Sequence, residues 1–218
     1  MSPTPTSAAR AARRTRIADF WFDPACPYTW ITSRWIREVE RVRDVEVRWH
    51  VMSLSVLNEA REVDPEGDTD GYLWMPVRVC AAVQERHGQR ALGDFFTAFG
   101  SRVHGHGDWN WETVLPDALA EAGLPRELAQ AAGTHTYDAA VRASHARGIG
   151  LVGADVGTPV IAVREGEEGE RTAFFGPCVS PAPRGEAAGR LWDGTLLMAG
   201  VREFYEFRRT AAPVDFRG

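Results

Sequence analysis

The sequence predicts an α/β fold in which a strand–helix–strand unit and a strand–strand–helix unit flank a large block of helices. Three observations predict it: a βαβ pattern near the N-terminus, the loss of strand-like alternation over residues 56–150, and the return of β-like segments afterwards. The chain has 218 residues. That length fits one large domain or a domain that carries an insertion.

The first unit begins with residues 17–22, an aromatic and β-branched segment typical of a buried strand. After Cys26-Pro27, apolar residues recur every three or four positions, which predicts a helix. These residues are Ile31, Trp35, Val39 and Val42. Apolar and polar residues then alternate over 45–52, which predicts a half-buried strand. Strand, helix and strand in this order predict a βαβ unit with parallel strands.

The middle of the chain is rich in Ala, Leu, Arg and Glu, in segments separated by Gly, Pro and Asp. We expect helices over residues 73–89, 92–103, 111–121, 126–132 and 135–146. Gly88, Gly123 and Gly148 lie where C-terminal helix caps are expected. The block therefore predicts a helical insertion.

The second β unit consists of residues 156–163, a charged turn over 164–171 and a second apolar run over 172–176, which together predict an antiparallel hairpin. A helical region closes the chain. We expect its apolar face to consist of Leu196, Leu197, Val201, Phe204 and Tyr205.

The order βαβ, helical block, ββα is the thioredoxin fold with a large helical domain inserted between its halves. The predicted organisation is a disordered N-terminal lead over residues 1–16, a thioredoxin-like domain over 17–55 and 151–218, and an inserted helical subdomain over 56–150.

The composition is that of a soluble globular chain, with 44% hydrophobic and 25% charged residues. The apolar runs are far shorter than the roughly 18–20 residues that span a bilayer. The N-terminal lead also lacks the apolar core of a secretory signal, so we expect a cytoplasmic protein with no membrane partner. All 25 basic residues are arginine, which excludes Schiff-base chemistry on lysine. The net charge of −5 argues against a nucleic-acid partner, and we attribute the arginine bias to a GC-rich genome.

Three cysteines, Cys26, Cys80 and Cys178, do not form a secreted disulfide framework. Cys26 opens the first predicted helix, where free N–H groups and the helix dipole can lower a cysteine pKa from about 8.5 to roughly 3.5–7.5. Pro27 takes the first helical position, and Thr29 lies one turn beyond the sulfur. Cys26 is therefore the predicted nucleophile, and we expect Cys80 and Cys178 to pack in the core.

Thr158-Pro159 begins the third predicted strand, a position where proline is tolerated because no ladder hydrogen bond is lost. In the thioredoxin arrangement this position holds a cis proline that faces the nucleophile, and the residue before it offers backbone groups to a substrate. We expect this role for Thr158 and Pro159, although the sequence is also compatible with an ordinary trans proline.

Two sets of segments carry a resemblance to known proteins. Residues 22–30 and 157–159 resemble the DsbA-like branch of the thioredoxin superfamily. A wider set resembles the mycothiol-dependent nitroreductase family of actinobacteria: residues 30–35, 50–54, 56–59, 152–159, 174–177 and 183–193. The resemblance implies that mycothiol, a low-molecular-weight thiol, serves as a cosubstrate, and that disulfides or electrophilic nitro compounds are reduced.

The chain departs from that family's CPWC-type dithiol, because Tyr28 replaces the Trp and Thr29 replaces the second Cys. We therefore infer a monothiol cycle in which Cys26 forms a mixed disulfide with mycothiol and a second mycothiol releases it. Thr29 would donate a hydrogen bond to the thiolate. The predicted substrate-binding residues are Pro27, Tyr28, Asn58, Tyr72, Thr158 and Pro159.

Tyr28 suits stacking on a flat substrate. Asn58 and Tyr72 resemble pocket residues of the family, and a helix cap and a half-buried aromatic are equally compatible interpretations. His104 and His106 are assigned to a loop, because no further His or Cys cluster lies nearby in the sequence. No metal or nucleotide cofactor is expected.

Two other functions stay open. One is an enzyme resembling kappa-class glutathione transferases or chromene-carboxylate isomerases, in which the helix residue only activates a bound thiol. The other is a redox-inactive binding protein. In the leading interpretation the partners are a low-molecular-weight thiol and a small-molecule or disulfide substrate, and a homodimer is compatible with the sequence.

Overall fold

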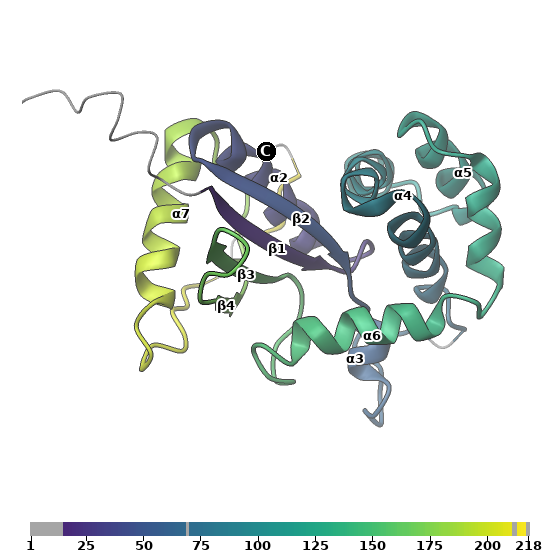
Figure 1. The fold of residues 1–218 in the computed structure, drawn as a ribbon. Coiled ribbons are helices and arrows are strands. Elements are labelled where there is room, and N and C mark those ends of the chain that lie inside the picture. The colour runs from purple at the N-terminus through teal and green to yellow at the C-terminus, as the bar shows by residue number, and fades with distance from the viewer. Residues whose placement is uncertain (1–14, 69, 211–212, 217–218) are drawn as a thin grey trace, which may run out of the picture.

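A computed structural model describes residues 15–68, 70–210 and 213–216 (Figure 1). Within these ranges, the elements follow the predicted order βαβ, helical block, ββα. Most of the predicted disordered lead, residues 1–14, lies outside the described residues. The division into domains near residues 55 and 151 stays a prediction.

The sheet contains β1 (Arg16–Phe22), β2 (Val45–Val51), β3 (Val160–Glu165) and β4 (Thr172–Phe175). Their spatial order is β2-β1-β3-β4. β1 and β2 are parallel, whereas β3 is antiparallel to both of its neighbours. This is the thioredoxin topology, which confirms the predicted fold class.

Two helices cover one face of the sheet. They are α2 (Pro27–Val42), which connects the parallel strands, and α7 (Gly185–Ala199), which lies against it. The indole N–H of Trp35 donates a hydrogen bond to the carbonyl of Ala188 at 3.1 Å, and its ring lies 6.0 Å from that of Trp192. All three residues are fully buried, so this contact forms the centre of the core between α2 and α7.

The predicted apolar face of the last helix is wrong. α7 ends at Ala199, so Val201, Phe204 and Tyr205 lie beyond it and are exposed, and Leu197 on the helix is 76% exposed. Only Leu196 of the predicted set is partly buried against the core. The 3.6-residue spacing does not apply to residues that follow the end of a helix.

The opposite face of the sheet is covered by the end of α6 (Asp138–Ile149). The side chain of Trp21 packs there with Met52 and Val160. A Cβ placed on Gly148 would lie 2.8 Å from the Trp21 ring, so the helix approaches the sheet at a residue without a side chain. Gly148 therefore lies inside α6 and packs against the sheet, whereas the sequence analysis expected a cap.

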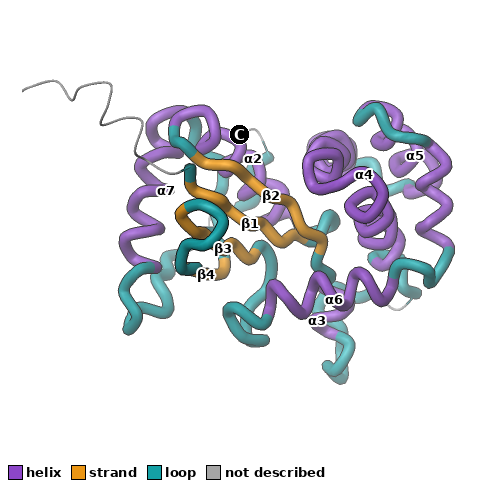
Figure 2. Tube along the Cα trace, in the orientation of Figure 1, coloured by secondary structure: helices purple, strands orange, loops and turns teal. Residues whose placement is uncertain are grey.

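The remaining helices gather beside the β2 edge of the sheet (Figure 2). They are α3 (Leu54–Asn58), α4 (Trp74–Gly100), a π-helical turn (Ser101–Gly105), α5 (Trp111–Glu121) and a 3-10 segment (Arg126–Gly133). α4 contains the break that was predicted at Gly88, where φ is 83°. The short α3 was not predicted, and the segment after Pro125 is 3-10 where an α-helix was expected.

The close approach at Gly148 makes a stability prediction. Gly148→Ala should destabilise the fold by about 1–3 kcal/mol, because the methyl group displaces the buried Trp21 ring. Urea unfolding measures this change. Gly194→Ala on α7 is the matched control: its Cβ meets no atom within 4 Å, and alanine should raise helix stability slightly. Equal effects of the two substitutions would contradict the prediction.

Candidate active site

Cys26 lies where the first strand passes into the first long helix. β1 ends at Phe22, and Cys26 is the N-cap of α2, with Pro27 in the first turn as predicted. The Cys26 backbone is extended, with φ of −74° and ψ of 118°. Its side chain is 7% exposed. The thiol therefore lies at the N-terminus of a helix but is buried beneath the protein surface.

The loop before Cys26 is held by a buried carboxylate. Asp23 accepts hydrogen bonds from the backbone N–H groups of Ala25 and Leu54, each at 2.8 Å. Leu54 is the first residue of α3, so the Asp23 side chain joins the loop before Cys26 to the helical block. Burial raises the pKa of Asp23 to about 7. The negative charge of Asp23 in turn raises the pKa of the Cys26 thiol.

The predicted partners of Cys26 face it from the start of β3. The Thr158–Pro159 peptide bond is cis, as the thioredoxin arrangement implies. The hydroxyls of Thr29 and Thr158 are 2.5 Å apart and both are buried. Hydrogen bonding by both hydroxyls acts to lower the pKa of the Cys26 thiol, against the larger effect of burial. The structure thus brings together Cys26, Thr29, Thr158 and Pro159, although the two threonines are 129 positions apart along the chain.

The expected low pKa of Cys26 is not found. Burial is the largest influence and raises the pKa of the thiol, because a thiolate loses hydration there. Hydrogen bonds from the Thr158 and Thr29 hydroxyls and from the Thr29 N–H act in the opposite direction but do not outweigh it. Cys26 is therefore held as a protonated thiol that has hydrogen-bond donors ready for its thiolate.

The structure places the other predicted binding residues in different environments. Tyr28 is 38% exposed on the first turn of α2, as a stacking residue would need to be. Asn58 is buried, and its amide donates to Asp64 at 3.4 Å. The Tyr72 hydroxyl donates to the carbonyl of Trp109. Asn58 and Tyr72 thus bond to the helical block, and any contact with substrate stays a prediction.

A group of aromatic rings around His104, next to the loop before Cys26, was not predicted from the sequence. His104 lies in the π-helical turn, where a loop was expected, and its Nε2 donates to the carbonyl of Pro24 at 3.0 Å. Burial lowers the pKa of His104 to about 4, so the ring is neutral. The rings of Trp30, Trp109 and Phe216 lie 5.8–5.9 Å from it. The spacing of the two histidines singled out this position, but nothing in it indicates a contact with Pro24.

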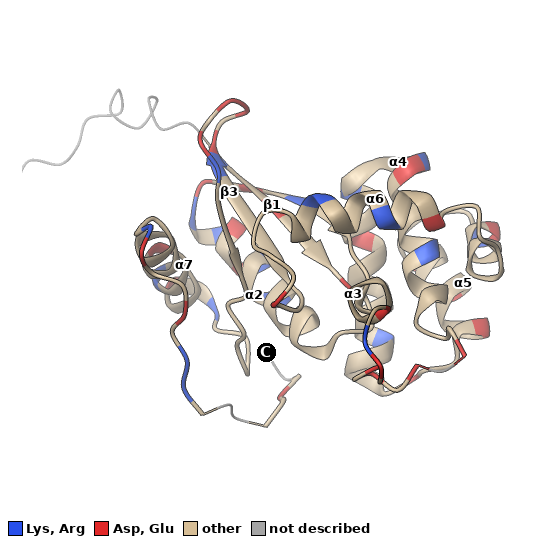
Figure 3. Cartoon of the chain, turned by 90° about the horizontal axis from the view of Figure 1, so that it is seen from below, with Lys and Arg blue, Asp and Glu red and all other residues tan. Residues whose placement is uncertain are grey.

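Phe216 belongs to the segment that follows α7 and returns toward α2 (Figure 3). Ser180 binds this segment, because its hydroxyl donates a hydrogen bond to the carbonyl of Pro213 at 2.9 Å and accepts one from the N–H of Asp215 at 2.8 Å.

Figure 3 also shows acidic and basic residues interspersed over the helices and the hairpin.

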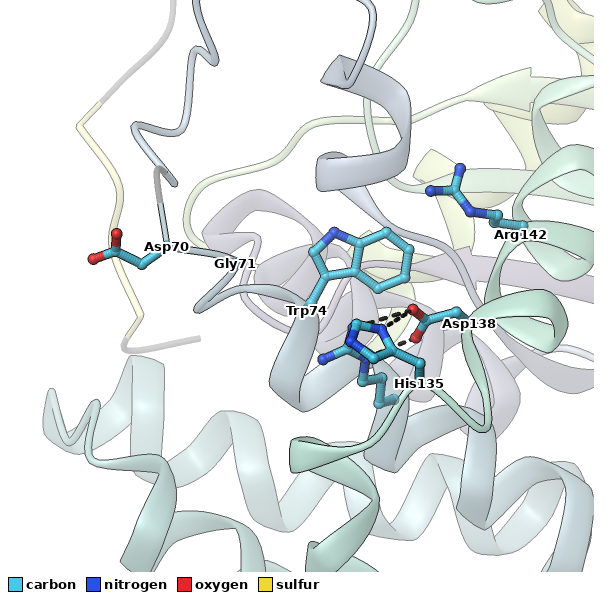
Figure 4. A pocket seen from close by; sticks show the side chains of 7 residues that line it. Asp70, Gly71, Trp74, His135, Asp138 and Arg142 are labelled. Atoms are coloured by element: carbon cyan, nitrogen blue, oxygen red, sulfur yellow. Dashed lines mark hydrogen bonds and ion pairs between the residues drawn. The ribbon is translucent and has the colours of Figure 1, made fainter.

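A separate cavity of about 460 Å³ lies between α4 and α6 (Figure 4). Arg78 and Arg142 line it and lie over the same Trp74 ring, each at 5.3 Å. Both guanidinium groups are already paired, Arg78 with Asp138 and Arg142 with Glu59. The cavity shares no lining residue with the Cys26 centre.

Across the described ranges, His, Cys, Asp and Glu form no group of three or more that could hold a metal ion. A search of the same residues finds no helix long and apolar enough to cross a membrane.

The charge of Asp23 predicts a measurable change in Cys26. Asp23→Asn should lower the pH midpoint of Cys26 alkylation, because a neighbouring like charge disfavours the thiolate. Iodoacetamide labelling between pH 6 and 10, read at the Cys26 peptide by mass spectrometry, measures it. Asp117→Asn on α5, where the carboxylate pairs with Arg126 at 2.8 Å, is the control and should leave the midpoint unchanged. An unchanged or raised midpoint in Asp23→Asn contradicts the prediction.

The sequence and the fold were compared with those of known proteins. The model of the Rv2466c-like family, described as mycothiol-dependent nitroreductase Rv2466c, matches residues 25–209. The protein Rv2286c of Mycobacterium tuberculosis is 30% identical over 201 residues, which cover 90% of this chain and 83% of that protein.

Solved structures of similar fold share much less sequence. The cytosolic disulfide reductase DsbM of Pseudomonas aeruginosa is 19% identical, with a TM-score of 0.51 over 83% of this chain and 98% of that one. A 2-hydroxychromene-2-carboxylate isomerase is 14% identical, with a TM-score of 0.56 over 85% and 95% of the two chains. These likenesses show the DsbA-like thioredoxin fold.

The family match spans Cys26, the helical block and the cis Thr158–Pro159 bond. The chain therefore belongs to the Rv2466c-like family of mycothiol-dependent nitroreductases and is a thiol-dependent oxidoreductase.

Proposed function

We propose that this protein uses Cys26 as a single redox nucleophile and mycothiol as the reducing thiol. The Cys26 thiolate attacks a mixed disulfide, forms a new S–S bond and releases the other sulfur as a thiolate. Mycothiol then attacks this bond and frees Cys26. For an electrophilic nitro compound, two mycothiol molecules are oxidised to their disulfide, while the nitro group takes up their two electrons and two protons, is reduced to a nitroso group and loses one oxygen as water.

One observation carries this proposal: Cys26 faces the cis Thr158–Pro159 bond with the Thr29 hydroxyl in place. Thr29 takes the position of a second thiol and cannot form a disulfide. Its hydroxyl and that of Thr158 supply hydrogen bonds to the sulfur, which favour the thiolate. This arrangement supports attack by Cys26 and release by an external thiol.

The substrate would bind over the exposed edge of this centre. Thr158 and Pro159 offer backbone groups beside the sulfur, and the Tyr28 ring is accessible for stacking on a flat molecule. Pro27, Asn58 and Tyr72 complete the proposed binding residues. Reduction by a low-molecular-weight thiol also suits a cytoplasmic location, because that compartment keeps thiols reduced.

A second candidate function is activation of a bound thiol without redox chemistry at Cys26. The raised pKa of Cys26 favours it, because a protonated thiol can donate a hydrogen bond to the thiolate of a bound cosubstrate. An isomerase of this kind would turn over its substrate with no net consumption of mycothiol. Measuring mycothiol disulfide during turnover separates the two candidates.

Loss of the nucleophile is the first prediction of the redox proposal. Cys26→Ser should reduce mycothiol-dependent reduction at least about a thousandfold, because a serine hydroxyl is not deprotonated near neutral pH. The rate of mycothiol disulfide formation measures it. Cys80→Ala, at a fully buried thiol of α4, is the control and should retain activity. Full activity in Cys26→Ser would rule out the proposed mechanism.

The second prediction concerns Thr29 as a positioning residue. Thr29→Val keeps the shape but removes one donor to the sulfur, so the Cys26 pKa should rise further. Because the thiolate is the reactive form, the alkaline rise of the rate should move to higher pH. Thr113→Val on the exposed side of α5 should leave the pH profile unchanged. A lower rate with an unmoved profile would indicate a structural role only.

A further inference from the structure

Cys178 lies in a different place from the one expected. Its apolar character predicts a place in the core, but Cys178 is exposed, in the segment that joins β4 to α7. Cys80, the other cysteine assigned to the core, is fully buried in α4 as expected. Of the two, only Cys178 is accessible for thiol chemistry without unfolding.

Two hydrogen bonds fix the segment around Cys178 to the walls of the Cys26 centre. The N–H of Gly176 donates to the carbonyl of Pro159 at 2.9 Å, next to the cis peptide bond. The hydroxyl of Thr32 donates to the carbonyl of Pro177 at 2.9 Å. Cys178 is the residue directly after this second anchor.

Both anchors belong to the Cys26 centre. Pro159 follows Thr158, whose hydroxyl contacts the Cys26 sulfur. Thr32 lies one turn beyond Thr29 on α2, so both face the same side of the helix. The segment that carries Cys178 is therefore attached to both elements that surround the Cys26 sulfur, the start of β3 and the first two turns of α2.

Electrostatics gives the same proximity. The charge of Cys26 raises the pKa of Cys178, in addition to the effect of burial. This influence supports the proximity that the two anchoring hydrogen bonds give to the Cys178 segment and the Cys26 centre.

We propose that Cys178 is a resolving thiol for Cys26 and that the two form an intramolecular disulfide during the redox cycle. The proposal rests on the proposed function, because the mixed disulfide of Cys26 with a low-molecular-weight thiol is its starting point. The mixed disulfide on Cys26 can then be resolved within the protein, even though Thr29 replaces the second Cys. We call this route the internal branch of the cycle.

The step is a thiol–disulfide exchange without net oxidation. Cys178 loses its proton to solvent, and its thiolate attacks the Cys26 sulfur of the mixed disulfide. The Cys26–Cys178 bond forms, the bond to the small thiol breaks, and the small thiolate leaves and takes up a proton. Two further molecules of the small thiol then reopen the internal disulfide and leave as their own disulfide.

The experiment uses the full chain, reduced and freed of small thiols, and then treated with one equivalent of mycothiol disulfide. The unmodified protein should lose the mass of two hydrogens and yield a linked peptide pair containing Cys26 and Cys178. Cys178→Ser should instead keep one mycothiol adduct on Cys26, with a lifetime at least about tenfold longer, because intramolecular attack has a high effective concentration. Cys80→Ala is the matched control and should behave as the unmodified protein.

A second arm replaces mycothiol disulfide with Ellman's reagent at less than one equivalent, so that it does not depend on recognition of mycothiol. Each reagent molecule should release two thionitrobenzoate ions from the unmodified protein but one from Cys178→Ser or Cys26→Ser. If this arm closes the disulfide while mycothiol disulfide leaves every variant unmodified, the proposed function fails and the inference stands. Equal adduct lifetimes in the unmodified protein and Cys178→Ser, with no linked peptide in either arm, would overturn the inference.

Discussion

The buried carboxylate of Asp23 binds two backbone N–H groups that belong to different parts of the fold, one in the loop before Cys26 and one at the start of α3. An unpaired buried amide costs about 1–3 kcal/mol, so each bond strongly favours this loop conformation. On the other side of the loop, the neutral His104 ring binds the Pro24 carbonyl. The position of Cys26 at the N-terminus of α2 thus depends on contacts from the helical block.

This anchoring has an electrostatic consequence. Burial raises the pKa of the Asp23 carboxyl to about 7, and the charge of its ionised form raises the pKa of the Cys26 thiol. Burial of Cys26 raises its pKa as well, against the hydrogen bonds from Thr29 and Thr158. A fold that encloses the thiol holds it in the protonated form, while the same two hydroxyls are positioned to stabilise the thiolate when it forms.

Much of this fold could be predicted from the sequence because its signals are local. The strand predicted over 45–52 and the Cys26-Pro27 helix start depend on neighbouring residues and were confirmed, but the strand is not half-buried throughout, because Trp49, His50 and Val51 are all buried. The position of the Thr158–Pro159 bond in the site followed from the order of elements. The pKa of Cys26 could not be predicted, because it depends on how deeply the helical block and β3 enclose the loop.

The remaining errors concern contacts between distant segments. The face of α7 is set by Trp35 of α2, and Cys178 is placed by anchors at Thr32 and Pro159. Apolar content predicted burial for Cys178, but the segment after β4 follows the edge of the active site. No spacing in the sequence encodes that path.

The relation between the two thiols gives the internal branch a direction. When Cys26 ionises to attack, its charge adds to the effect of burial, and both raise the pKa of Cys178, so ionisation of the two thiols together is disfavoured. Once Cys26 is bound in a mixed disulfide, it carries no charge and this opposition disappears. Cys178 then ionises more readily, at the stage when a second nucleophile is useful. Burial still raises the pKa of Cys178 at that stage, but the loss of the Cys26 charge favours attack by Cys178 after the attack by Cys26.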